Sequence, residues 1–171
     1  VHRLAVREGL SLAEAAGRWF DRFLDAAVAP LLLAQTDFGL LFGAHQQNLL
    51  VRLEDHYPTD VYYRDCQGTG FCREHLDALL RDTGVTPEAL GHVFDAATAA
   101  RVVSYYLIVN NVFNVVSALA IAGTSAEAPL LRRMRDFLVA LRAQVTGDPT
   151  VIDFLLTAPQ LWSKRNFLVS L

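Results

Sequence analysis

Hydrophobic positions recur at helical spacing over most of the chain. The first clear helix begins at Ser11, because Ser11 and Glu14 have the spacing of a capping box. The apolar positions that follow share one face: Leu12, Ala15, Ala16, Trp19, Phe20, Phe23, Leu24 and Ala27. Pro30 has no backbone N–H, so we expect the helix to kink or restart there and to continue through residues 31–33. Gly39 is a candidate for a further break.

After Asn48 the pattern changes to a period of two, which is typical of a β-strand. Leu49, Val51 and Leu53 alternate with Leu50, Arg52 and Glu54. A second β-prone run, residues 61–63, follows the turn-forming segment 55–59. With the turn centred on residues 56–57, the resulting antiparallel hairpin places Asn48 roughly opposite Asp65, with cross-strand Cβ atoms about 5 Å apart. The hairpin therefore brings its two polar ends together.

The remainder of the chain is predicted to be mainly helical. We expect a short helix or turn over 40–47, a loop over 67–70, a helix over 73–82, a helix capped by Thr86 with Pro87 at its first position, an apolar helix over 105–122, a helix from about 125 that ends before Gly147, and short helices over 150–156 and 160–171. In the helix from 125, we expect Leu130, Leu131, Met134, Phe137, Leu138 and Leu141 to face inward, and Arg132, Arg133, Arg135 and Arg142 outward. The pattern predicts an α+β fold that is predominantly α: a helical bundle with an antiparallel β-hairpin that carries active-site residues.

Composition limits the classes of function. The 171 residues, 53% of them hydrophobic, are enough to bury one core, so we expect a single domain over residues 1–171. The net charge of −3 provides no basic field for nucleic acid or for an anionic membrane surface. Cys66 and Cys72 are too few for a disulfide framework, and we expect reduced thiols in a cytoplasmic protein. Because the chain starts at Val1 rather than at Met, we expect it to be part of a longer protein.

The apolar run over residues 102–123 is long enough to cross a bilayer. It contains Asn110, Asn111 and Asn114, whose carboxamides would each need a hydrogen-bond partner in hydrocarbon. Neighbouring helices of a soluble bundle can supply such partners. We therefore expect a buried bundle helix with helix-to-helix hydrogen bonds rather than a membrane span.

The densest cluster of polar residues lies at the two ends of the hairpin. His45, Gln47 and Asn48 precede it, and Arg64 and Asp65 follow it. Carboxamide and carboxylate oxygens suit a hard cation such as Mg²⁺, which is often shared with nucleotide phosphates. The histidine could donate a hydrogen bond to a carboxylate, and the arginine could neutralise a phosphate. Polar residues at strand ends also satisfy backbone groups, so spacing alone leaves a structural interpretation open.

Two segments around the hairpin carry a family resemblance. They are the stretch from Phe38 to Asn48, which reads Phe-Gly-Leu-Leu-Phe-Gly-Ala-His-Gln-Gln-Asn, and the stretch from Tyr63 to Gly68, which reads Tyr-Arg-Asp-Cys-Gln-Gly. Together they resemble the C-terminal, FhuF-like domain of the aerobactin-type siderophore synthetases, the IucA/IucC family, which build siderophores without a non-ribosomal peptide synthetase. The resemblance is continuous from about Thr36 to Gly70 and compatible over the helical remainder. Its most specific part is His-x-Gln-Asn followed by the Arg-Asp pair.

The resemblance implies an ATP- and Mg²⁺-dependent ligase. In this family a carboxylate, often of citrate or a citrate derivative, attacks the α-phosphate to form an acyl-adenylate, and an amine, hydroxylamine or alcohol then displaces AMP. By motif position, Gln47, Asn48 and Asp65 would hold the metal and its phosphates. His45 would contact the carboxylate and stabilise the charge that develops during acyl transfer. Arg64 completes the implied nucleotide-binding set around the hairpin.

Two further features of the family bear on the site. Many members carry Glu two residues before the histidine, where this chain has Gly43, so one expected metal ligand is missing. The family also has a lysine in its C-terminal helix, and Lys164 is either an anion or substrate contact or a solvent-exposed side chain. Other ATP and substrate residues of the family lie on a preceding region, so we expect this chain to be the C-terminal part of a catalyst.

Alternative functions remain open at this point. The family's C-terminal region is also described as resembling a ferric reductase, but a cysteine cluster for iron and sulfur would be needed and the chain has only two cysteines. A kinase-like phosphotransferase could use His, Asn and Asp around a hairpin, although no glycine-rich phosphate loop supports it. A non-catalytic helical module, including a homodimer, could use the apolar helices as a partner surface. Cys66 beside Asp65 is interpreted as structural rather than nucleophilic, because acyl-adenylate chemistry needs no thiol.

Overall fold

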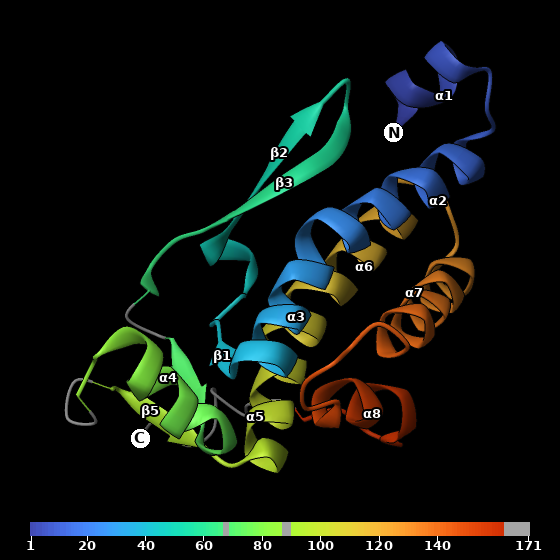
Figure 1. Cartoon of the computed structure of the whole chain (residues 1–171). Coiled ribbons are helices and arrows are strands. Elements are labelled where there is room, and N and C mark those ends of the chain that lie inside the picture. Colours follow the sequence, from blue (N-terminus) through green and yellow to red (C-terminus); the bar gives the residue numbers. More distant parts are fainter. Residues whose placement is uncertain (67–68, 87–89, 163–171) are drawn as a thin grey trace, which may run out of the picture.

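Helices form most of the computed structural model, which describes residues 1–66, 69–86 and 90–162 (Figure 1). The α-helices are α1 (His2–Glu8), α2 (Leu12–Phe23), α3 (Ala29–Phe38), α4 (Leu76–Thr83), α5 (Ala96–Val103), α6 (Phe113–Ile121), α7 (Glu127–Arg142) and α8 (Thr150–Thr157). The strands are β1 (Leu40–Leu41), β2 (Leu49–Glu54), β3 (Tyr57–Tyr63), β4 (Gly70–Cys72) and β5 (His92–Phe94). The predicted α+β fold, predominantly helical and with a β-hairpin, is confirmed.

The first long helix runs from α2 through a π-helical stretch, η1 (Leu24–Val28), into α3. Its capping box is confirmed, because the Glu14 N–H donates to Ser11 Oγ and the Ser11 N–H donates to the Glu14 carboxylate. The expected restart at Pro30 is also confirmed. Pro30 cannot donate, and the preceding turn widens so that the Ala29 N–H reaches the Leu24 carbonyl. Gly39, with φ of 68°, ends α3 as expected.

The second long helix joins α5, the π-helical stretch η6 (Ser104–Val112) and α6 without interruption. It starts at Ala96, earlier than predicted, because the Asp95 carboxylate accepts from the Thr98 N–H and caps the first turn. Within the described ranges it is the one helix long and apolar enough to cross a membrane, and half of its most apolar stretch is buried in the protein. Its buried side chains, including Leu107 and Ile108, belong to the main core, as expected of a bundle helix.

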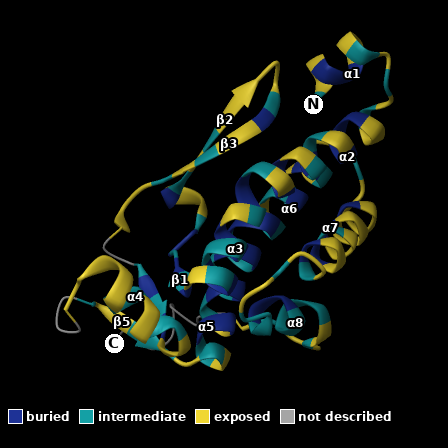
Figure 2. Cartoon of the chain, viewed as in Figure 1, coloured by how far each residue is buried: buried dark blue, intermediate teal, exposed yellow. Residues whose placement is uncertain are grey.

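The core lies where these two long helices meet α7 and α8, and Figure 2 shows their buried faces turned toward one another. Of the predicted inward residues of α7, Leu130, Met134, Leu138 and Leu141 are buried. Leu131 is 39% exposed and Phe137 is half-buried, because α7 covers the outside of the bundle and buries only a narrow stripe. The outward arginines are confirmed as surface residues, except that Arg142 is partly buried and pairs with Asp153.

The hairpin formed by β2 and β3 packs along α2 and η1, with its tip beside α1 (Figure 1). Its turn is tighter than predicted: only Asp55 and His56 form it, with φ of 50° and 71°, as in a type I′ turn. A bulge beyond Arg52 leaves one extra residue in β3. Tyr57 lies in β3, and its hydroxyl donates to the Glu8 carboxylate at 2.9 Å. The tip is thereby attached to α1.

The turn and bulge together correct the predicted register by one residue. Leu49 pairs with Tyr63, and the Arg64 N–H donates to the Asn48 carbonyl at 3.0 Å. Arg64, rather than Asp65, is therefore opposite Asn48. The position of Asp65 relative to Asn48 then depends on the backbone after β3.

A second, three-stranded sheet was not predicted. β4 pairs antiparallel with β1 and parallel with β5. Residues 40–47 accordingly form β1, an irregular stretch and the start of a 3-10 turn, η2 (Gln46–Asn48), instead of one short helix. The helix predicted after Thr86 falls partly on residues 87–89, outside the described ranges, and Leu90 and Gly91 are not helical and lead into β5. Strands of two or three residues are too short to show a period.

The last predicted elements have different outcomes. The helix over 150–156 is confirmed as α8. The helix predicted over 73–82 is confirmed as a 3-10 turn, Arg73–His75, followed by α4. Residues 160–162 are not helical, and the rest of the helix predicted over 160–171, including Lys164, lies outside the described residues.

We expect Gly147→Ala to destabilise the protein. A Cβ atom at Gly147 would lie 2.1 Å from the carbonyl oxygen of Thr36, in backbone that cannot move aside easily. Overpacking of this kind should lower the free energy of unfolding by about 3 kcal/mol. Gly91→Ala is the matched control, since nothing lies within 4 Å of its added methyl group, and it should change stability by less than about 0.5 kcal/mol. Denaturant unfolding of both variants checks this, and equal stabilities would contradict it.

Candidate functional site

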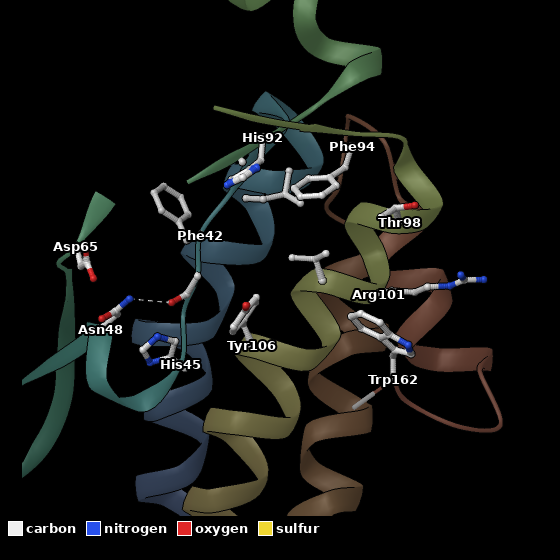
Figure 3. A pocket seen from close by; sticks show the side chains of 14 residues that line it. Phe42, His45, Asn48, Asp65, His92, Phe94, Thr98, Arg101, Tyr106 and Trp162 are labelled. Carbon is white, nitrogen blue, oxygen red and sulfur yellow. Dashed lines mark hydrogen bonds between the residues drawn. The ribbon is translucent and has the colours of Figure 1, made fainter. Parts of the chain in front are cut away.

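A cavity of about 560 Å³ opens between the irregular stretch after β1, the three-stranded sheet and the helix formed by α5 and η6 (Figure 3). Its lining residues are Leu41, Phe42, Gly43, His45, Asn48, Asp65, Gly70, His92, Phe94, Thr98, Arg101, Val102, Tyr106 and Trp162. The walls combine apolar and aromatic side chains with a few polar groups. This combination is typical of a small-molecule site.

His45 lies in the irregular stretch between β1 and η2. Its side chain is half-buried, and its ring centroid is 6.0 Å from that of Tyr106 on η6. Its backbone is extended and directly precedes η2, so that the His45 carbonyl accepts the Asn48 N–H at 2.9 Å. The 3-10 turn therefore places His45 and Asn48 on the same wall of the cavity.

Asn48 and Asp65 meet at the polar side of the cavity. Asn48 is 7% exposed, and its Nδ2 donates to the Gly43 carbonyl at 3.2 Å. Asp65 is exposed and has φ of 63°, a left-handed conformation that turns the chain at the end of β3. Figure 3 shows its carboxylate beside the Asn48 side chain. The predicted proximity of the two residues is met, although by this turn rather than by direct pairing.

Gln47 and Arg64 lie outside the cavity, unlike His45, Asn48 and Asp65. Neither is among the residues that line the cavity, and both side chains are exposed. Arg64 Nε donates to the Gln47 backbone carbonyl at 2.8 Å. The contact ties the exit of β3 to η2, so in this structure Arg64 stabilises the backbone that carries Asn48.

The side chains at the cavity restrict which kind of metal ion could bind there. The described parts of the chain contain no group of three or more His, Cys, Asp or Glu side chains that could hold one. Asn48 and Asp65 still offer amide and carboxylate oxygens, and Gly43 contributes no side chain. Such a pair fits Mg²⁺, which keeps several waters and is commonly held by one or two carboxylates together with phosphates. It does not fit a metal held by protein ligands alone.

Other lining residues of the cavity are functional candidates that the sequence did not reveal. They are His92, Phe94, Thr98, Arg101, Tyr106 and Trp162. β5 was not predicted, and α5 was expected to begin later, so nothing linked these positions to His45. Asp95, a residue type that often caps helices, could have indicated from the sequence that α5 starts at Ala96. Arg101 is exposed and is the one permanently cationic side chain among the described lining residues.

Comparisons with known proteins show that the chain is similar to part of several citrate-using synthases and ligases. The family described as "Ferric iron reductase FhuF-like transporter" matches residues 17–171. The chain is 36% identical to the N(2)-citryl-N(6)-acetyl-N(6)-hydroxylysine synthase of Vibrio mimicus over 98% of its length, and 37% identical to the Escherichia coli enzyme of the same name. It is 32% identical to the spermidine-citrate ligase of Bacillus anthracis. It spans only 28% of the length of each of these relatives.

Solved structures agree with this similarity. The ATP-bound aerobactin synthetase IucA from a hypervirulent pathotype of Klebsiella pneumoniae matches with a TM-score of 0.89 and 38% identity. The match covers 97% of this chain and 29% of that one. The fold described above is thus that of one part of a longer synthetase.

The two cysteines differ in accessibility. Cys66 is exposed and follows Asp65, but it is not among the residues that line the cavity. Cys72 is buried, and burial raises the pKa of its thiol, while Gln35 Nε2 donates to its sulfur. With two cysteines in the whole chain, no cluster exists to bind iron and sulfur.

We expect Cys66, but not Cys72, to react with iodoacetamide in the native protein at pH 8. The Cys72 thiol is inaccessible and, with its pKa raised, stays protonated at this pH, whereas the thiolate is the nucleophile. Peptide mass spectrometry after brief labelling measures both sites. Labelling in denaturant is the control, since it should modify both thiols, and rapid native labelling of Cys72 would contradict the burial described here.

Proposed function

The chain belongs to the FhuF-like family and is homologous to the aerobactin-type siderophore synthetases, and on this basis we propose that it is the C-terminal part of an ATP-dependent ligase. The ligase would adenylate a carboxylate of citrate or a citrate derivative and condense it with an amine, hydroxylamine or alcohol. Similarity to two N(2)-citryl-N(6)-acetyl-N(6)-hydroxylysine synthases and to a spermidine-citrate ligase supports a citrate-like acid and an amine-type nucleophile. We propose a cytoplasmic location, where ATP is available.

One observation carries the proposal: His45, Asn48 and Asp65 converge at one side of a cavity that is otherwise lined by apolar and aromatic side chains together with His92, Thr98 and Arg101. A carboxylate-activating site needs a place for a charged phosphate with its metal and a nearby donor for the substrate carboxylate. Asn48 and Asp65 would provide metal-facing oxygens, and half-buried His45 would donate a hydrogen bond to the carboxylate. The volume of about 560 Å³ is in the range of small-molecule sites.

When bound, ATP would supply the adenylyl group and a pyrophosphate leaving group, with Mg²⁺ neutralising phosphate charge. The protein itself would position ATP and the substrate carboxylate and would exclude water. The aromatic wall, with Phe94 and Tyr106, would shield the reactive carbonyl from hydrolysis. Gln47 and Arg64 would join the phosphate-binding set if the Arg64 side chain left the Gln47 carbonyl, and both are exposed enough to do so. Lys164 remains a candidate anion contact from the predicted C-terminal helix.

We expect the full-length protein to convert ATP to AMP and pyrophosphate when given citrate and an amine. The acyl-adenylate route releases these products, because attack is at the α-phosphate. Separation of nucleotides by chromatography, with a coupled pyrophosphate assay, measures them. Steady release of ADP would instead favour a kinase-like phosphotransferase. Function without any nucleotide, together with stable dimerisation of this chain, would favour the non-catalytic interaction module.

We expect His45→Ala and Asp65→Asn to reduce kcat/KM for ligation by about 100-fold or more, a loss of about 3 kcal/mol of transition-state stabilisation. Asn is preferable to Ala at Asp65, because Asn tolerates the left-handed backbone there while removing the charge. His2→Ala and Asp77→Ala are matched controls on exposed helical positions away from the cavity. Steady-state kinetics with circular dichroism checks this. Full activity in both site variants would show that His45 and Asp65 have no role in catalysis.

A further inference from the structure

The wall that carries His45 is built from backbone without regular secondary structure. Residues 42–45 lie between β1 and η2, and Gly43 and Ala44 are buried. Buried peptide groups outside helices and sheets need partners from elsewhere. The Gly43 carbonyl accepts from Asn48, within the same turn. The Ala44 and His45 N–H groups donate locally, to the Phe42 and Gly43 carbonyls. Two further contacts come from distant elements.

The first distant contact comes from the long apolar helix. Asn111 Nδ2 donates to the Ala44 carbonyl at 3.2 Å across 67 positions of sequence, and Asn111 is 3% exposed. The Ala44 carbonyl and the His45 N–H belong to one peptide plane. Fixing that carbonyl therefore fixes the plane from which the His45 side chain extends. The contact joins helix to loop, which corrects the expectation of helix-to-helix bonding for Asn111.

The π-helical stretch η6 explains how one helix contributes twice to this wall. Tyr106, whose ring lies 6.0 Å from that of His45, and Asn111 are five residues apart. In a regular α-helix such residues would point about 140° apart, since each residue advances about 100°. Hydrogen bonds from i to i+5 in a π-helix bring positions five apart close to one another on the surface. The widened turn thus lets Tyr106 and Asn111 both face the His45 segment.

The second distant contact comes from the end of β3. The Gly43 N–H donates to Tyr63 Oη at 3.1 Å, and the Tyr63 hydroxyl donates to the Asp65 carbonyl at 3.3 Å. The ring packs edge-on against Phe42, with centroids 4.8 Å apart. A phenol hydroxyl can accept one hydrogen bond and donate another at the same time. One oxygen atom therefore connects the His45 segment to Asp65.

The geometry points to Asn111 and Tyr63 as positioning residues for His45 and Asp65. Neither is among the residues that line the cavity, and they act through the Ala44 carbonyl, the Gly43 N–H and the Asp65 carbonyl. The inference rests on the proposed function for its kinetic consequence, while its structural content stands on these contacts alone. A misplacement of about 1 Å in a catalytic group can cost about 100-fold in rate, so contacts of this kind influence turnover more than stability.

The test uses Asn111→Leu, which keeps the volume and removes the donor, and Tyr63→Phe, which removes only the hydroxyl. In the full-length synthetase we expect kcat for ligation to fall about 10- to 100-fold in Asn111→Leu and about tenfold in Tyr63→Phe. In Asn111→Leu, KM for ATP should stay within about threefold of wild type, since Asn111 acts through the Ala44 carbonyl and His45 rather than through Asn48 and Asp65. Hydrogen exchange measured by mass spectrometry should be faster over residues 42–48 in both variants.

Matched controls lie beside each residue. Asn114→Leu removes an exposed carboxamide that donates within its own helix, to Asn110, and Tyr62→Phe removes an exposed hydroxyl one position before Tyr63. Both should leave kcat and the exchange of residues 42–48 within about twofold of wild type. If Asn111→Leu does not fold, Tyr63→Phe still decides the outcome, because its ring packing is retained.

Two results would overturn the inference. One is unchanged exchange over residues 42–48 in the folded variants, and the other is a loss of kcat in the controls equal to that in Asn111→Leu and Tyr63→Phe. Failure of the proposed function looks different: the wild-type protein would then release no AMP. In that case the exchange comparison alone would still show whether Asn111 and Tyr63 hold the His45 segment.

Discussion

The site depends on how buried peptide groups of a short irregular segment are satisfied. Gly43 and Ala44 belong to neither helix nor sheet, yet they are buried, so their N–H and carbonyl groups need partners. The Ala44 N–H donates to the Phe42 carbonyl and the His45 N–H to the Gly43 carbonyl, and the remaining bonds need side-chain partners. Those partners are Asn48, Tyr63 and Asn111, from the 3-10 turn, the hairpin and the apolar helix. The same bonds that remove a desolvation cost therefore join three elements around His45.

This arrangement explains why the apolar helix contains a buried asparagine, Asn111. An asparagine amid apolar positions is costly unless its amide is paired, and Asn111 pairs with the loop that carries His45. Asn114, by contrast, lies at the surface and bonds within its own helix. The widened helical turn, often found at functional sites, brings Asn111 and Tyr106 to the same wall. Length and apolarity alone would make this helix resemble a membrane span, whereas its packing and polar contacts are those of a core helix.

Two names attach to the family, and the chain's chemistry bears on both. The matched family is described as a ferric reductase-like transporter, while the similar full-length proteins are named as citrate ligases and synthetases. One exposed and one buried cysteine provide no cluster for iron and sulfur. The proposed carboxylate activation would use the imidazole, the amide and the carboxylate that line one side of the cavity.

The sequence by itself determined the helices with strong periodicity, the capping box at Ser11, the hairpin, and the family motif that contains His45, Asn48 and Asp65. These features are local, because each depends on residues a few positions apart. Tertiary structure decided the rest. The strands β4 and β5 are too short to show a hydrophobic period. A two-residue turn and a bulge together moved the hairpin register by one position from the predicted one. Asp65 comes close to Asn48 through its own left-handed backbone conformation. His92, Arg101 and Asn111 joined the site or its support only through packing across 47 to 66 positions of sequence from His45, and contacts between distant segments leave no signature in the pattern of a single chain.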